Sequence, residues 1–187
     1  MKLIGCVSTP VLNGGDRKDA FMSFLTSLTQ SLQAQTGWAG SVPLTISARD
    51  AAVDCEVDVT AIDRLSCSIA EIRLGGPFLA NATYNQLQDW ARNFSRKITY
   101  LLEELGPLEF DPQAGQVLVR SIKPDTLPDG TAYFEVMLEL QTGTMFSMKR
   151  YRYVKGQPGR NPIDMHLTVE VLSKLLNDLV ISFPAVP

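Results

Sequence analysis

Histidine and cysteine, on which many catalytic and metal sites depend, are scarce in this chain of 187 residues. His166 is the only histidine, and the three cysteines, Cys6, Cys55 and Cys67, occur in no C-x-x-C or Cys/His spacing. Multi-histidine metal centres and the common zinc sites are therefore excluded, because they need several nitrogen or sulfur ligands at set spacings. Three cysteines cannot all pair with one another, which favours a reducing compartment. We expect a cytoplasmic protein that binds no metal and no other cofactor.

The motifs of the common catalytic classes are also absent. The chain contains no G-x-S-x-G, H-E-x-x-H, G-x-x-x-x-G-K-[ST] or G-x-G-x-x-G segment. Each of these motifs places a nucleophile, a pair of metal ligands or phosphate-binding backbone amides at a set spacing. Any histidine-dependent mechanism would depend on His166 alone. These absences favour a protein without enzymatic activity.

Neither charge sign is in large excess, and no long apolar run is present. The chain has 17 Lys and Arg, 20 Asp and Glu and a formal net charge of −3, with 45% hydrophobic residues. This balance is typical of a globular domain and gives no general attraction to nucleic acid or to an anionic membrane. The apolar runs are only a few residues long, whereas a membrane-spanning helix needs about 18 residues or more. We expect neither nucleic acid nor a membrane as a partner.

The N-terminal residues carry a motif that has two interpretations. The segment Leu3–Cys6 matches the box at which bacterial lipoproteins are cleaved and lipidated. A secretory signal has an apolar segment before its cleavage site, but only Met1 and Lys2 precede this box. We interpret residues 1–15 as an N-terminal arm, and the alternative is the remnant of a lipoprotein signal. Residues 182–187 are interpreted as a C-terminal tail, and the whole chain as a single domain.

The periodicity of the first half predicts a helix followed by three strands. Asp16 is a suitable N-cap, and apolar residues after it recur at helical spacing, namely Phe21, Leu25, Leu28 and Leu32. Strands are predicted over residues 42–48, 53–60 and 66–74. The third strand changes its apolar phase near Ile69-Ala70, which predicts a bulge there.

Acidic side chains alternate along the second strand. Asp54, Glu56 and Asp58 point to the same face and could in principle bind a divalent cation. Successive side chains on one face of a strand lie about 7 Å apart, which is too far for them to converge on one ion. We interpret these residues as a solvated face, or as charges that protect an edge strand from aggregation.

A second long helix is predicted over residues 83–105. Thr83 and Gln86 form a capping box, and Gly106-Pro107 is a typical stop signal. An apolar stripe follows one face of this helix, formed by Tyr84, Leu87, Ala91, Phe94, Ile98, Leu101 and Leu105. The stripe could also be a contact between two copies of the chain, but we favour packing on the chain's own sheet. Tyr84 and Trp90 at its edges are then the candidate interface residues of a homodimer.

The pattern after residue 115 predicts a strand over 116–123 and then a long hairpin. Its two-residue turn is placed at Thr142-Gly143, which sets Glu135 opposite Arg150 and Tyr133 opposite Arg152. Basic residues between 149 and 160 alternate with tyrosines, as in surfaces that bind single-stranded nucleic acid. In this register, however, Glu135 offsets Arg150.

The closing segment predicts a loop and a last helix. The Gly/Pro-rich loop 156–162 is of the kind that can edge a site. Asp164 is the predicted N-cap of the helix, which puts His166 in its first turn.

The order of elements predicts an α+β fold: helix, three strands, helix, three strands, helix, with an antiparallel sheet or sheets packed by helices. This order resembles that of the class I type III secretion chaperones and their bacterial relatives. The resemblance depends on the order of the predicted elements, namely the helices 16–36 and 83–105, the strands 42–48, 53–60 and 66–74, and the second strand set with its closing helix. The resemblance implies a small acidic protein, often dimeric and without enzymatic activity, that holds an extended segment of a secreted partner against hydrophobic patches. The chain is longer than members of that family, with a third C-terminal strand and an N-terminal arm.

Two hypotheses about function follow. The first is a non-enzymatic bacterial protein-binding or chaperone-like module, which uses a sheet edge or exposed apolar residues around strands 53–60 and 66–74. The second is a small-ligand-binding protein or an enzyme, in which a curved sheet and the helix 83–105 enclose a pocket. The candidate binding residues of that pocket are Tyr133, Glu135, Arg150, Arg152 and His166. An open groove favours the first hypothesis, and a closed pocket containing these side chains favours the second.

Overall fold

The computed structural model describes residues 14–50, 53–79, 81–140 and 144–184 of the chain, with side chains from residue 24 onward except those of Phe78 and Thr144. The described residues form three α-helices, one short 3-10 helix and ten strands. In chain order these are α1 (Gly14–Ala34), β1 (Ala39–Arg49), β2 (Asp54–Ile62), β3 (Ser66–Gly75), η1 (Pro77–Leu79), α2 (Tyr84–Lys97), β4 (Leu105–Asp111), β5 (Gln116–Ser121), β6 (Asp125–Leu127), β7 (Gly130–Glu139), β8 (Thr144–Val154), β9 (Asn161–Ile163), β10 (Met165–Thr168) and α3 (Val169–Ser182).

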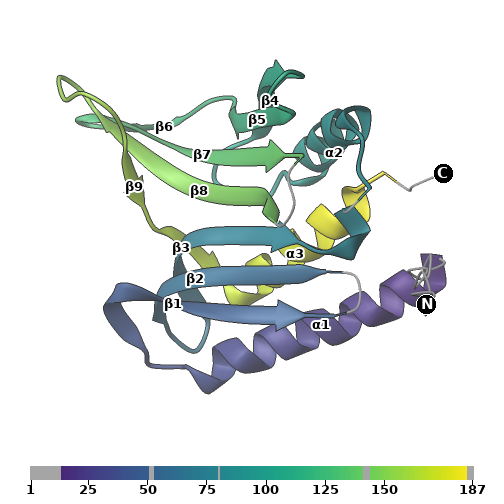
Figure 1. Ribbon diagram of the computed structural model, residues 1–187. Helices are drawn as coiled ribbons and strands as arrows, with labels where there is room; N and C mark the ends of the chain where they lie inside the picture. Colours follow the sequence, from purple (N-terminus) through teal and green to yellow (C-terminus); the bar gives the residue numbers. More distant parts are fainter. Residues whose placement is uncertain (1–13, 51–52, 80, 141–143, 185–187) are drawn as a thin grey trace, which may run out of the picture.

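The ten described strands belong to one antiparallel sheet (Figure 1). The order of its main path is β1-β2-β3-β8-β7-β5-β4, with β6 on β7, β9 on β8 and β10 on β3. The predicted α+β class with an antiparallel sheet packed by helices is confirmed. The strand group after α2 is larger than predicted, because the described residues there form seven strands instead of three.

Strands β2 and β3, which correspond to the predicted strands 53–60 and 66–74, lie inside the sheet. β2 lies between β1 and β3, and β3 lies between β2 and the strands β8 and β10. A partner therefore finds no free sheet edge at these strands, contrary to expectation. The outer strands of the main path are β1 and β4, and each contains a proline, Pro43 or Pro107, and a break in its ladder register. Such edges disfavour pairing with another strand, because proline has no N–H to donate.

A short ladder between β3 and β8 joins the two strand groups. It runs from the pair Ile72 and Met148 to the pair Gly75 and Thr144. Before Ile72, β3 pairs with β10 instead, and after Met148, β8 pairs with β9. Residues 161–168 therefore lie between the two strands where these diverge.

The three described helices cover one face of the sheet (Figure 1). α1 packs on β1, α2 packs on β4, β5 and β7, and α3 contacts α1, α2 and β10. The opposite face carries no helix in the described part of the chain, and we call it the helix-free face. Trp90 of α2 is fully buried in the core, and its indole Nε1 donates a hydrogen bond to the Leu179 carbonyl oxygen of α3 over 2.8 Å. Its ring contacts those of Phe94, Phe146 and Phe183.

Helix α2 begins as predicted and ends earlier. The capping box of Thr83 and Gln86 is present. The helix stops at Lys97, because Ile98 takes the non-helical angles φ −87° and ψ 86° while its N–H still bonds to the Phe94 carbonyl oxygen. Leu105, predicted as the last helical position, is buried as the first residue of β4. The predicted end of the helix is therefore wrong, since the stop signal Gly106-Pro107 lies within an edge strand, where proline is tolerated.

The last helix also begins later than predicted. Its N-cap is Thr168, whose hydroxyl oxygen accepts a hydrogen bond from the Val171 N–H. The predicted N-cap, Asp164, precedes β10 and accepts a hydrogen bond from the Thr60 hydroxyl. His166 is therefore in a strand opposite Ser68, and not in a helical first turn.

The hairpin register differs from the prediction by one residue. Glu135 pairs with Lys149, Phe134 with Arg150, and Tyr133 with Tyr151. The predicted turn, Thr142-Gly143, lies outside the described residues. A shift of one residue moves a side chain to the other face of the sheet, so Arg150 lies on the side of the helices and Glu135 on the helix-free face.

The ends of the chain also differ from expectation. Helix α1 begins at Gly14, so the predicted N-cap Asp16 lies inside the helix. Its buried residues are Phe24, Leu28 and Leu32, while Phe21 precedes the residues whose side chains are described. In the predicted C-terminal tail, Ser182 and Phe183 are buried.

Candidate functional site

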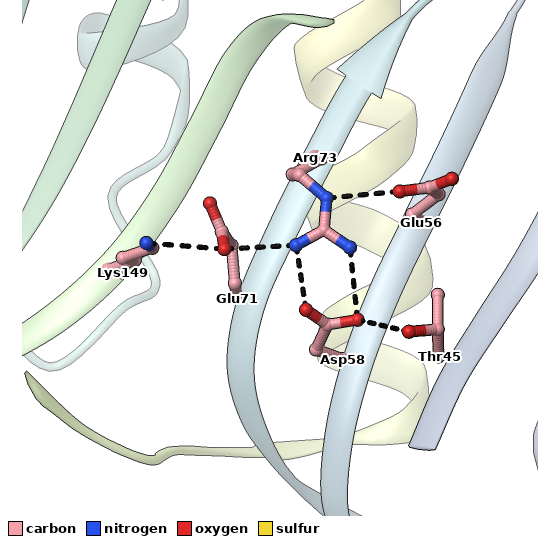
Figure 2. A network of polar contacts seen from close by, with 6 residues as sticks. All are labelled: Thr45, Glu56, Asp58, Glu71, Arg73 and Lys149. Atoms are coloured by element: carbon pink, nitrogen blue, oxygen red, sulfur yellow. Dashed lines mark hydrogen bonds and ion pairs between the residues drawn. The ribbon is translucent and has the colours of Figure 1, made fainter. Parts of the chain in front are cut away.

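The helix-free face carries a network of charged side chains. Strand alternation places apolar residues against the helices and polar residues on the opposite face. Figure 2 shows part of this face, with α3 behind the strands, and the network consists of Thr45, Glu56, Asp58, Glu71, Arg73 and Lys149.

Arg73 is the centre of this network. Its Nη1 and Nη2 donate to the Asp58 carboxylate over 2.7 and 3.0 Å, and its Nε donates to Glu56 over 3.0 Å. The hydrogen bond from Arg73 holds the pKa of the Asp58 carboxyl below its usual range, and Asp58 in turn raises the pKa of the Arg73 guanidinium. Glu71 accepts from Arg73 over 2.9 Å and pairs with Lys149 of β8 at 3.2 Å. These contacts tie β2, β3 and β8 together on this face.

The acidic residues of β2 therefore bind arginines. Asp54 pairs with Arg49 of β1 at 2.5 Å, while Glu56 and Asp58 bind Arg73. The described residues contain no group of three or more His, Cys, Asp or Glu side chains that could hold a metal ion. The interpretation of these charges as protection of an edge strand is wrong, because β2 lies inside the sheet.

A second group on the helix-free face, which we call the tyrosine–arginine cluster, consists of Arg120, Tyr133, Glu135, Tyr151 and Arg160. The Glu135 side chain is only 8% exposed, and its Oε2 accepts hydrogen bonds from Arg120, over 2.7 Å, and from Arg160. The Arg120 guanidinium lies 4.8 Å from the centre of the Tyr133 ring, and that of Arg160 lies 4.2 Å from the centre of the Tyr151 ring. The shared carboxylate and the cation–π contacts hold both guanidiniums in place.

An open depression of about 550 Å³ adjoins this cluster. Both arginines and Tyr133 line it, together with Tyr153, whose exposed fraction is 41%. Two guanidiniums share one carboxylate here, so the local charge is positive although the chain as a whole has a net charge of −3. The arrangement can bind an anionic group next to an aromatic surface.

Arg150 belongs to a buried ion pair on the other face. Its Nη2 lies 2.5 Å from Glu103 Oε1, and the two side chains are 9% and 3% exposed. Burial raises the pKa of the Glu103 carboxyl above its usual range. The pair joins β8 to the segment that follows α2, and it is separated by the sheet from Tyr133 and Glu135.

The structure brings together only two of the five predicted binding residues, Tyr133 and Glu135. Arg152 binds Asp129 at the end of the hairpin, at 2.6 Å. His166 is exposed on β10, where its Nδ1 lies 2.9 Å from the Ser68 hydroxyl oxygen.

The two predicted interface residues differ in exposure. Trp90 is fully buried, so its side chain offers nothing to a second subunit. Tyr84 is half-buried, and its hydroxyl donates to the Gln116 carbonyl oxygen over 3.4 Å.

Sequence reasoning missed Arg120 and Arg160 as members of one site. The alternation of β5 places Arg120 on the partly exposed face of the strand with Gln116 and Leu118. This alternation could have identified Arg120 as a residue of that face from the sequence. Arg160 lies in the loop 156–162 that the sequence marks as able to edge a site, and this loop does line the depression through Gly159 and Arg160. Nothing in the sequence indicates that the two arginines share Glu135.

Comparisons with known proteins returned no match: no family model, no curated protein and no solved structure matches the chain. The resemblance to type III secretion chaperones in element order therefore stays a prediction. Within the described residues, no helix is long and apolar enough to cross a membrane.

Proposed function

We propose that this chain is a protein-binding module without enzymatic activity, and that it holds a segment of a partner protein on its helix-free face. The observation that carries this proposal is the tyrosine–arginine cluster beside an open depression of about 550 Å³. Tyrosine and arginine are enriched among the residues that contribute most to protein–protein binding, because each combines a large contact area with directed hydrogen bonds.

The face is held in position before any partner binds. Glu135 and the tyrosine rings fix Arg120 and Arg160, while Arg73 fixes the neighbouring carboxylates. A preorganised surface loses less conformational entropy on binding, so more of the contact energy contributes to affinity.

Charge complementarity indicates an acidic partner segment. The depression is lined by two arginines that share a single carboxylate, and Tyr153 beside them is 41% exposed. An acidic residue next to an apolar or aromatic residue matches this surface. Both outer strands of the main path contain proline, and the strands off this path, β6, β9 and β10, are only three or four residues long. Docking on the face is therefore favoured over strand addition at an edge.

The alternative, a pocket protein or enzyme, has less support. Its predicted polar residues do not converge, since Arg150 lies on the helix side, and Arg152 and His166 bind other groups. The depression is open, whereas small-ligand sites bury most of the ligand surface.

The proposal can be tested with a phage library of random dodecapeptides displayed with free C-termini. We expect the purified chain to select peptides that bind the wild type and lose about tenfold or more in affinity on Tyr153→Ala and Arg160→Gln. The matched control is Arg96→Gln on α2, whose Nη2 donates to Asn93 over 2.7 Å and which should leave affinity unchanged. The proposal is wrong if no peptide is selected, or if the selected peptides bind the face variants and the wild type equally.

A further inference from the structure

We infer that the depression is a carboxylate-binding subsite, in which Arg120 and Arg160 together bind a carboxylate group of the partner. This inference rests on the proposed function and specifies the chemistry of the partner. The carboxylate has two sources in a protein, an Asp or Glu side chain and the C-terminus.

The two guanidiniums have donors to spare. Each guanidinium has five N–H donors, and the contact with Glu135 uses Nη2 of Arg120 and Nη1 of Arg160. Nε of Arg120 is buried and has no hydrogen-bond partner among the described residues, so it is not among the donors that a ligand in the depression reaches. Both side chains are partly exposed, at 30% and 40%, and both line the depression. The donors available to a ligand in the depression are therefore the remaining Nη groups at the partly exposed ends of the two side chains.

Glu135 already shows which group these arginines bind. Its carboxylate oxygen bridges both guanidiniums, while Tyr133 and Tyr151 support them from their ring faces. A guanidinium held in this way loses little further freedom when a second carboxylate binds, and it can form paired N–H to oxygen bonds.

The charge balance favours a carboxylate over a phosphate. Two guanidiniums and one carboxylate leave a single positive charge at the cluster. One further carboxylate neutralises that charge, whereas a phosphate group carrying nearly two negative charges would leave an excess of negative charge beside the buried Glu135. The exposed Tyr153 ring offers an apolar contact to the residue next to the carboxylate.

The first experiment uses the peptides selected on the helix-free face. Each peptide is remade with its Asp and Glu residues changed to amides, and separately with an amidated C-terminus, so that the two sources of the carboxylate are distinguished. We expect one of these changes to weaken binding by about tenfold, and Arg120→Gln or Arg160→Gln to do the same. Arg152→Gln, which changes an arginine bound to Asp129 outside the depression, should have no effect.

The second experiment needs no peptide. Sodium acetate and inorganic phosphate are titrated into the ¹⁵N-labelled chain, and the Nε–Hε resonances of Arg120, Arg160 and Arg96 are followed by NMR. We expect acetate to shift the first two resonances saturably and to leave that of Arg96 unchanged, with a weaker response to phosphate. Circular dichroism of each variant confirms that it is folded.

The outcomes separate this inference from the proposed function. If peptides bind the face but their amide versions bind equally well, and acetate shifts neither resonance, the carboxylate subsite is wrong while the protein-binding function stands. If acetate shifts both resonances but no peptide is selected, the subsite stands and the protein-binding function is wrong.

Discussion

Charged residues on the two faces of the sheet are held in different environments. Arg73 and Asp58 are partly exposed, at 22% and 18%, and share hydrogen bonds with further charged groups. Arg150 and Glu103 are nearly fully buried and depend mainly on each other. Both pairs must offset a loss of hydration, and this cost is larger for the second pair, whose two charges are nearly fully buried.

The Arg73 network makes stability depend on pH. Because Arg73 lowers the pKa of Asp58 below its ordinary value of 3.8, the folded state favours the ionised carboxylate more than the unfolded state does. This contribution is fully present above that value and is lost as the pH falls through the lower folded pKa. We expect Asp58→Asn to lower the free energy of unfolding by about 1–3 kcal/mol at pH 7, and by less as the pH falls below 3.8.

Urea unfolding of both proteins between pH 7 and acidic pH measures this difference. The matched control is Asp89→Asn, which removes an exposed ion pair with Arg92 on α2 and should cost less than about 1 kcal/mol at pH 7. An equal loss for Asp58→Asn at neutral and acidic pH would contradict the prediction.

The buried pair predicts a double-mutant result. Removal of one partner leaves the other charge buried, so Glu103→Gln and Arg150→Met should each destabilise the protein by about 3–5 kcal/mol. The double variant should lose less free energy of unfolding than the sum of the losses of the two single variants, because it contains neither buried charge. Unfolding by urea at pH 7 measures all four proteins, and additive losses would show that the pair is not coupled.

At the scale of elements, the start of β7 depends on a close approach that only glycine permits. A Cβ atom on Gly130 would lie 1.9 Å from the carbonyl oxygen of Tyr153 on β8. We expect Gly130→Ala to destabilise the protein by about 3 kcal/mol or more, since backbone atoms of the hairpin would have to move. Thermal unfolding measures the effect.

The control for that variant is Gly156→Ala in the turn after β8. Gly156 has a φ of +83°, but a Cβ atom added there would meet no other part of the described chain within 4 Å. This change should therefore cost only about 1–2 kcal/mol of backbone strain. Equal losses for the two variants would show that the contact with Tyr153 can be relieved easily.

At the scale of the molecule, one hydrophobic core connects both strand groups. Buried residues of β2, such as Val57, and of β5, such as Val119, belong to the same core cluster, which also includes residues of all three described helices. The strand groups are joined through the β3–β8 ladder and through α3, which contacts both α1 and α2. A continuous core of this kind is expected to unfold as one cooperative unit.

The two tryptophans test this expectation, because one lies in each half: Trp38 precedes β1 and Trp90 lies in α2. With 5-fluorotryptophan in both positions, the two ¹⁹F resonances should report the same urea midpoint. Val57→Ala and Val119→Ala should lower that midpoint for both resonances, each by about 2–3 kcal/mol of stability. Two separate midpoints would show that the halves unfold independently.

The sequence by itself determined the features that depend on neighbouring residues. The capping box of Thr83 and Gln86 was predicted, because both partners lie within one helical turn. The bulge near Ile69-Ala70 is confirmed: Asp58 pairs with Glu71 and Val59 with Ile69, so Ala70 has no counterpart. The presence of the hairpin follows from residue alternation in the same way, and its strands contain Tyr133 and Glu135 of the candidate site.

Where two local conformations have similar energy, only the tertiary structure decided between them, because contacts with distant residues favour one of the two. Helical spacing continued to Leu105, but this residue is buried in an edge strand because β5 and α2 provide its partners. Residues 161–168 form the strands β9 and β10 because β3 and β8 diverge there. β9 then pairs with β8, and β10 pairs with β3. The hairpin register places Arg150 beside Glu103 and leaves Glu135 to Arg120 and Arg160. These partners are distant in sequence, so the pairing of charges that forms the candidate site depends on how the strands pack.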